Sequence, residues 1–151
     1  MMRHLALCMA TALVFATGAA ASSADMSVTS SSYAAGARGV RLTVVLRYEI
    51  QCGYPGAAPV VLTLPGRIPT KVRTATVLVD GKPTRSVTVH GHELTIAMPP
   101  RPAIMCDSIT MGRLTLVLTA GAGVANPAAA GSYSVHASKG SLRFAARLAI
   151  R

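Results

Sequence analysis

Residues 40–50 read Val-Arg-Leu-Thr-Val-Val-Leu-Arg-Tyr-Glu-Ile, and this stretch decides the fold class. Its even-numbered positions carry apolar or aromatic side chains, whereas most odd-numbered positions carry polar ones, including Arg41 and Arg47. Successive side chains of a β-strand point to opposite faces, so this alternation predicts a strand with one buried and one solvated side.

The same alternation recurs along the rest of the chain. Apolar residues two apart occur over 60–64, 75–79, 87–89, 94–98, 114–118, 133–135 and 142–150. Dipeptides that end in glycine, which favour tight turns, separate some of these runs at 80–81, 90–91 and 139–140. No stretch after residue 21 shows the spacing of an amphipathic helix. The pattern therefore predicts an all-β domain, either a sandwich or a barrel.

The N-terminus has the organisation of an export signal. Arg3 precedes an uncharged apolar stretch over 5–18, and Ala19-Ala20-Ala21 offers an A-x-A cleavage site. An uncleaved anchor is the alternative, but the stretch is rich in Ala and Thr and weaker than a spanning helix of about 20 apolar residues. We expect a signal peptide at 1–21, a flexible lead-in at 22–38 with an edge strand near 26–30, and a β-domain at 39–151, without a transmembrane segment in the mature chain.

Two cysteines, Cys52 and Cys106, remain once the signal segment is removed. An even pair of cysteines in a small exported domain predicts a disulfide bond. It would close a loop of about 55 residues, worth about 4 kcal/mol in the chain-entropy description. Redox or metal-binding thiols are the alternative, but the two cysteines lack C-x-x-C spacing.

One local motif is more specific than the alternation. Asn126 and Pro127 start a turn, Gly131 permits a further bend, and Tyr133 opens a strand, as in a tyrosine corner. This N-P-x-x-x-G-x-Y stretch resembles that of secreted bacterial immunoglobulin-like modules, including surface-layer and wall-associated ones. The resemblance implies an immunoglobulin-like antiparallel β-sandwich of about seven to nine strands. The chain departs from antibody-type domains because it has no Trp and no Cys two residues after the tyrosine.

The charge is strongly basic, with 15 Lys and Arg against 5 Asp and Glu and a formal net charge of +10. Such a domain is attracted to polyanions, although high charge also keeps a secreted protein soluble. The sequence does not identify a partner, and anionic cell-envelope polymers are the candidate that the charge offers. Aromatics are too few for a nucleic-acid stacking platform. The expected contact residues lie on outer strand faces: Arg41, Arg47, Arg143 and Arg147.

The sequence offers little for catalysis. It has no phosphate-binding glycine loop and no nucleophile elbow. Glu49 and Glu93 are the only candidates for a carboxylate pair, and each lies on the polar side of a strand pattern. We therefore expect no enzyme activity and no cofactor.

A metal site is a separate alternative. His90 and His92 are spaced to present both rings on one side of an extended strand, as a copper site could use. A turn at His90-Gly91 is the simpler interpretation.

The expected function is a secreted, non-enzymatic structural or interaction module of the cell envelope or extracellular space. Two alternatives stay open: a basic polyanion-binding protein, and a periplasmic or extracellular carrier of copper or another metal.

Overall fold

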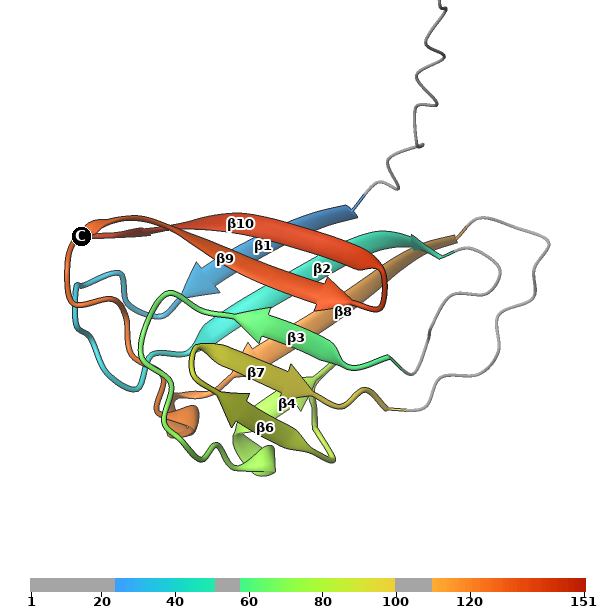
Figure 1. The fold of residues 1–151 in the computed structure, drawn as a ribbon, viewed down its shortest axis with the longest axis horizontal. Helices are drawn as coiled ribbons and strands as arrows, with labels where there is room; N and C mark the ends of the chain where they lie inside the picture. Colours follow the sequence, from blue (N-terminus) through green and yellow to red (C-terminus); the bar gives the residue numbers. More distant parts are fainter. Residues whose placement is uncertain (1–23, 51–57, 100–109) are drawn as a thin grey trace, which may run out of the picture.

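The computed structural model describes residues 24–50, 58–99 and 110–151, which form two antiparallel β-sheets packed face to face (Figure 1). The predicted antiparallel β-sandwich is thereby confirmed. The described residues contain ten strands, above the expected seven to nine because short strands such as β5 are included. They contain no α-helix, only the 3-10 turns η1 (Thr74–Thr76) and η2 (Ala120–Ala122). In this part of the chain, no helix has the length and apolar character needed to cross a membrane.

The first sheet is built around the 40–50 stretch, which forms its second strand. Its order is β1 (Ala24–Ser30), β2 (Leu42–Ile50), β8 (Thr110–Leu118), β4 (Val77–Val79) and β5 (Lys82–Pro83). Leu46 of β2 lies opposite Leu114 of β8 and both are fully buried, so the predicted apolar face is the inner face. The turn predicted at 80–81 joins β4 to β5, with positive φ at both Asp80 (48°) and Gly81 (82°). Two positive φ values are the requirement of a type I′ turn.

The second sheet has the order β10 (Leu142–Ile150), β9 (Gly131–Lys139), β3 (Val60–Thr63), β7 (Glu93–Ile96) and β6 (Val87–His90). The turns predicted at 90–91 and 139–140 connect β6 to β7 and β9 to β10. In both turns the glycine takes a positive φ, 60° at Gly91 and 57° at Gly140. Edge strands β1 and β10 of the two sheets lie side by side, which closes one flank of the sandwich (Figure 1).

The core between the sheets is aliphatic, as the composition requires, and it includes an aromatic contact. The rings of Tyr48 and Phe144 meet edge-on, with centroids 6.1 Å apart and planes at 69°. Lys139 is also buried here, at 1% exposure, and its Nζ donates to the Ala58 carbonyl oxygen at 2.7 Å. The ladder places Lys139 opposite Val60, an inward position, so the residue before the turn faces the core.

The expected lead-in at 22–38 needs correction in its described part. β1 pairs along its whole length with β2, from Ala24 opposite Tyr48 to Ser30 opposite Leu42. The edge strand expected near 26–30 therefore exists, and the sandwich begins before residue 39. The signal peptide and the proposed Cys52–Cys106 bond lie outside the described residues.

Candidate functional site

The predicted tyrosine motif fastens the loop before β9. The Tyr133 hydroxyl donates to the Ala129 carbonyl oxygen at 2.9 Å, four residues back in the chain. Asn126 is 5% exposed, and its Nδ2 donates to the carbonyl oxygens of Ser32 and Ala34, each at 2.9 Å. The tyrosine thus closes the loop locally, whereas the asparagine ties it to the chain that follows β1.

Residues 124–127 form a backbone spine with one loop fixed on each side. On one side, the Asn126 amide donates to the Ala37 carbonyl oxygen at 2.8 Å, and Arg38 lies opposite Ala125 in an antiparallel bridge. On the other side, the Ala125 amide donates to the Arg67 carbonyl oxygen at 2.9 Å. The backbones of Arg38 and Arg67 are therefore held on either side of the same residue.

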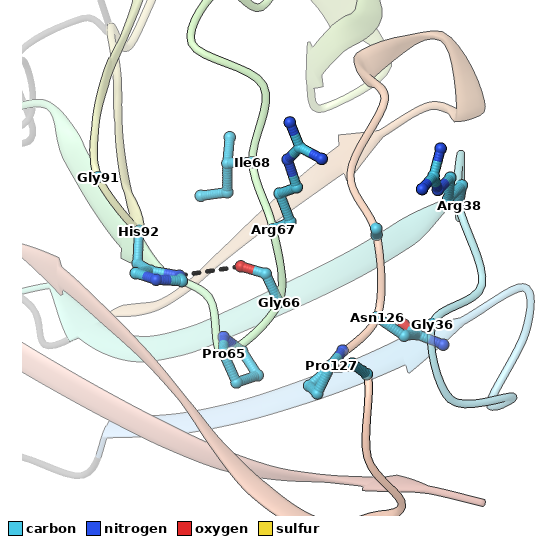
Figure 2. A pocket seen from close by; sticks show the side chains of 12 residues that line it. Gly36, Arg38, Pro65, Gly66, Arg67, Ile68, Gly91, His92, Asn126 and Pro127 are labelled. Carbon is cyan, nitrogen blue, oxygen red and sulfur yellow. Dashed lines mark hydrogen bonds between the residues drawn. The ribbon is translucent and has the colours of Figure 1, made fainter.

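Glycine makes the second of these contacts possible. A Cβ added to Gly66 would lie 1.9 Å from the Ala125 carbonyl oxygen, closer than any side chain tolerates. The same glycine accepts at its carbonyl oxygen from His92 Nδ1, at 2.9 Å (Figure 2). A carbonyl oxygen only accepts hydrogen bonds, so this contact places a proton on Nδ1.

A groove of about 430 Å³ lies where these segments meet (Figure 2). This volume falls within the range that is usual for small-molecule binding sites. It is much larger than the volume of a single bound ion. Pro65, Ile68 and Pro127 give it apolar walls, and Arg38, Arg67 and His92 give it polar groups. Its lining within the described chain includes no carboxylate. We call it the Arg38–Arg67 groove.

Arg67 and Arg38 lie on opposite sides of the 124–127 segment (Figure 2). Both arginines are exposed, and neither lies within ion-pair distance of a carboxylate among the described residues. Two like charges carried by neighbouring backbone segments repel each other, and an anion bound beside them lowers that repulsion.

The arginines expected to bind polyanions lie elsewhere and do not come together. Arg47 lies on the outer face of the first sheet, opposite Arg113 of β8 and Asp25 of β1. Its Nη1 is 3.2 Å from Asp25 Oδ2, with both side chains largely exposed. Such a surface ion pair is worth only about 0–1 kcal/mol. Arg41 immediately precedes β2, and its amide donates to Ser31 Oγ at 2.9 Å.

Arg143 and Arg147 lie on β10, opposite Ser138 and Ser134 in the second sheet. The Arg143 guanidinium donates to the Gly140 carbonyl oxygen at 2.7 Å, so it is partly engaged by its own turn. The two predicted arginine pairs therefore belong to different sheets.

The geometry assumed for a metal site is not present. His90 ends β6, and His92 lies in the turn that follows, so the two rings do not share one extended strand. The described residues contain no group of three or more His, Cys, Asp and Glu suited to a metal ion. Glu49 of β2 and Glu93 of β7 also lie in different sheets and form no carboxylate pair.

Sequence reasoning missed Arg38, which lies in the segment expected to be a flexible lead-in. Arg67 was not among the four arginines expected to bind polyanions. The available signal was the pair Pro65-Gly66 beside Arg67, which is typical of a turn where two backbone segments come close. The sequence around it does not indicate which segment is the partner.

Comparison with known proteins gives a likeness in fold alone. No protein family matches the sequence, and no curated protein matches it significantly. Among solved structures, the chain is similar to the crystal structure of BslA, a bacterial hydrophobin, with a TM-score of 0.51 and 16% identity. The match covers 85% of this chain and 98% of that one.

Proposed function

We propose that this protein is a secreted, non-enzymatic structural or interaction module of the cell envelope or extracellular space. The observation that supports it best is the likeness to BslA, which extends over 98% of that chain. At 16% identity the likeness establishes the fold, and the function is our inference from it. The export-type N-terminus is an independent argument from the sequence.

Because BslA is a bacterial hydrophobin, the likeness draws attention to exposed apolar surface. Among the described residues, two large apolar side chains are exposed, Tyr33 at 42% and Met111 at 62%. Tyr33 follows β1, near the Ser30–Leu42 end of the ladder, whereas Met111 lies opposite Glu49 at the other end. These two side chains do not form one patch, so the proposal does not rest on apolar adsorption.

The test is to express the whole chain in a bacterium with a general secretion pathway and to follow it by cell fractionation. We expect the protein in the envelope or the medium, with its N-terminus near residue 22 by mass spectrometry. Full-length protein that stays in the cytoplasm would contradict export. Exported protein that fails to sediment with envelope material or to bind any envelope or extracellular component would contradict an interaction role.

A second candidate function, polyanion binding by the sheet faces, is favoured by the placement of Arg47 directly opposite Arg113. We expect binding to purified wall polymer that weakens steeply as salt rises, since salt screens exposed charges beyond about 10 Å at 0.1 M. Binding that is insensitive to salt would rule this candidate out.

A further inference from the structure

We propose that the Arg38–Arg67 groove is a specific binding site for an oxyanion group, a phosphate or a carboxylate, carried on a small or polymeric ligand. The inference goes beyond the module function, and it does not require the sheet-face arginines to bind anything. It can be tested on purified protein whether or not export is confirmed.

The first argument is preorganisation. Hydrogen bonds from Ala125 to Arg67 and from Asn126 to Ala37 fix both arginine-bearing loops to one spine. A third bond, from the Gly36 amide to the Pro127 carbonyl oxygen at 2.8 Å, secures the outer loop. A ligand therefore binds without having to order these backbone segments, which lowers the entropic cost of association.

The second argument is charge. Arg38 and Arg67 line the groove from opposite flanks, and none of the described carboxylates lines it. By contrast, Arg47 is paired with Asp25 and Arg143 with the carbonyl oxygen of Gly140. The groove thus holds two guanidinium groups without an anionic partner in the described chain, and guanidinium geometry suits the paired oxygens of carboxylate and phosphate.

The third argument concerns what carries the anion. A volume of about 430 Å³ and walls of Pro65, Ile68 and Pro127 leave room for an uncharged part beside the anionic group. The described residues of the lining include no Phe, Tyr or Trp ring on which a nucleobase would stack. An anionic sugar unit, a uronic acid or a sugar phosphate, has the required combination.

His92 is assigned a positioning role. Its Nδ1 holds the Gly66 carbonyl oxygen, and Gly66 is the neighbour of Arg67 in the loop. The imidazole thus fixes the loop from the flank away from the spine. In the neutral ring with the proton on Nδ1, Nε2 only accepts hydrogen bonds, so it suits a ligand hydroxyl and not the oxyanion itself.

The experiment is an NMR titration of the exported protein with isotope-labelled amides, at constant ionic strength held with chloride. The probes are inorganic phosphate, glucose 1-phosphate and an oligomer of galacturonic acid. We expect saturable shifts centred on the amides of residues 36–38, 66–68 and 125–128. Response to the phosphates alone identifies a phosphate ligand, and response to the galacturonate alone identifies a carboxylate ligand. No saturable response to any probe overturns the proposal.

Matched variants separate a built site from general basicity. Arg38→Gln and Arg67→Gln should each raise the Kd about tenfold to a hundredfold, because each removes charge-assisted hydrogen bonds. The control is the double variant Arg143→Gln/Arg147→Gln, which removes the same charge as Arg38→Gln/Arg67→Gln and should change the Kd less than about twofold. Equal weakening by the two double variants, or shifts spread over the sheet faces, would overturn the site. Amide spectra of the free variants verify that each one is folded.

Discussion

The hydroxyl of Tyr133 donates a hydrogen bond to the carbonyl oxygen of Ala129 at 2.9 Å, and this bond closes the loop that leads into β9. Tyr133→Phe removes the bond and retains the ring. We expect a loss of about 0.5–1.5 kcal/mol in the free energy of unfolding, the usual net worth of such a bond. Urea denaturation of the two proteins measures it.

Tyr33→Phe is the matched control for this prediction. Tyr33 is exposed, and its hydroxyl oxygen accepts from the Ser30 amide only at the long distance of 3.3 Å. Its removal should change stability by less than about 0.5 kcal/mol, as is usual for surface substitutions. Equal losses in the free energy of unfolding for the two variants would show that the bond from Tyr133 to Ala129 does not stabilise the protein.

The Asn126 side chain should contribute more to the free energy of unfolding than the Tyr133 hydroxyl does. It is buried, and its Nδ2 satisfies two carbonyl oxygens that belong to the chain after β1. Asn126→Ala leaves both acceptors without this donor, so we expect destabilisation of about 1–3 kcal/mol. Calorimetry and hydrogen exchange both measure it, and the amides of residues 34–37 should lose protection. Unchanged protection there would contradict the role as a tie between loops.

Asp80 in the turn between β4 and β5 has two separable roles. Its Oδ1 accepts from the Thr115 amide at 2.8 Å, and its φ of 48° is unfavourable for most residues. Asp80→Asn keeps an acceptor and tolerates that φ, Asp80→Gly keeps only the backbone freedom, and Asp80→Ala keeps neither. The left-handed region costs an ordinary residue about 1–2 kcal/mol. We therefore expect stability to fall in the order Asn, Gly, Ala, as measured by thermal unfolding. A variant Asp80→Ala as stable as Asp80→Asn would show that neither role matters.

The strands and their tight turns could be predicted because their signals are local. Alternation marks the buried face of β2, and a glycine marks the turn that follows Lys139. The order of the strands depends on contacts between residues far apart in the sequence. The sequence of β2 does not indicate that β8 is its neighbour, and the sequence of β3 does not indicate that it lies between β9 and β7. Lys139 shows the same limit, since its residue type predicts exposure whereas its register opposite Val60 forces it inward.

The groove was beyond prediction for a related reason. Arg38, Arg67 and His92 come from three loops. They line one groove because residues 124–127 bond to two of these loops and Gly66 bonds to the third. Sequence spacing places side chains along one strand, so the arginines predicted as a site were those on strand faces. Those residues lie in separate sheets, whereas the charges that line the groove are carried by loops.

The register of the first sheet bears on the predicted disulfide bond. Ile50 at the end of β2 lies opposite Thr110 at the start of β8, so Cys52 follows one ladder partner by two residues and Cys106 precedes the other by four. Peptide mapping of the exported protein without reductant should yield a linked Cys52–Cys106 peptide. Reduction should lower the free energy of unfolding by about 4 kcal/mol, because the open loop regains its entropy in the unfolded chain. The double variant Cys52→Ser/Cys106→Ser is the control, since reductant should leave its stability unchanged. Free thiols at both positions in exported protein would contradict the bond, and the residual stability of the double variant would then measure the sandwich on its own.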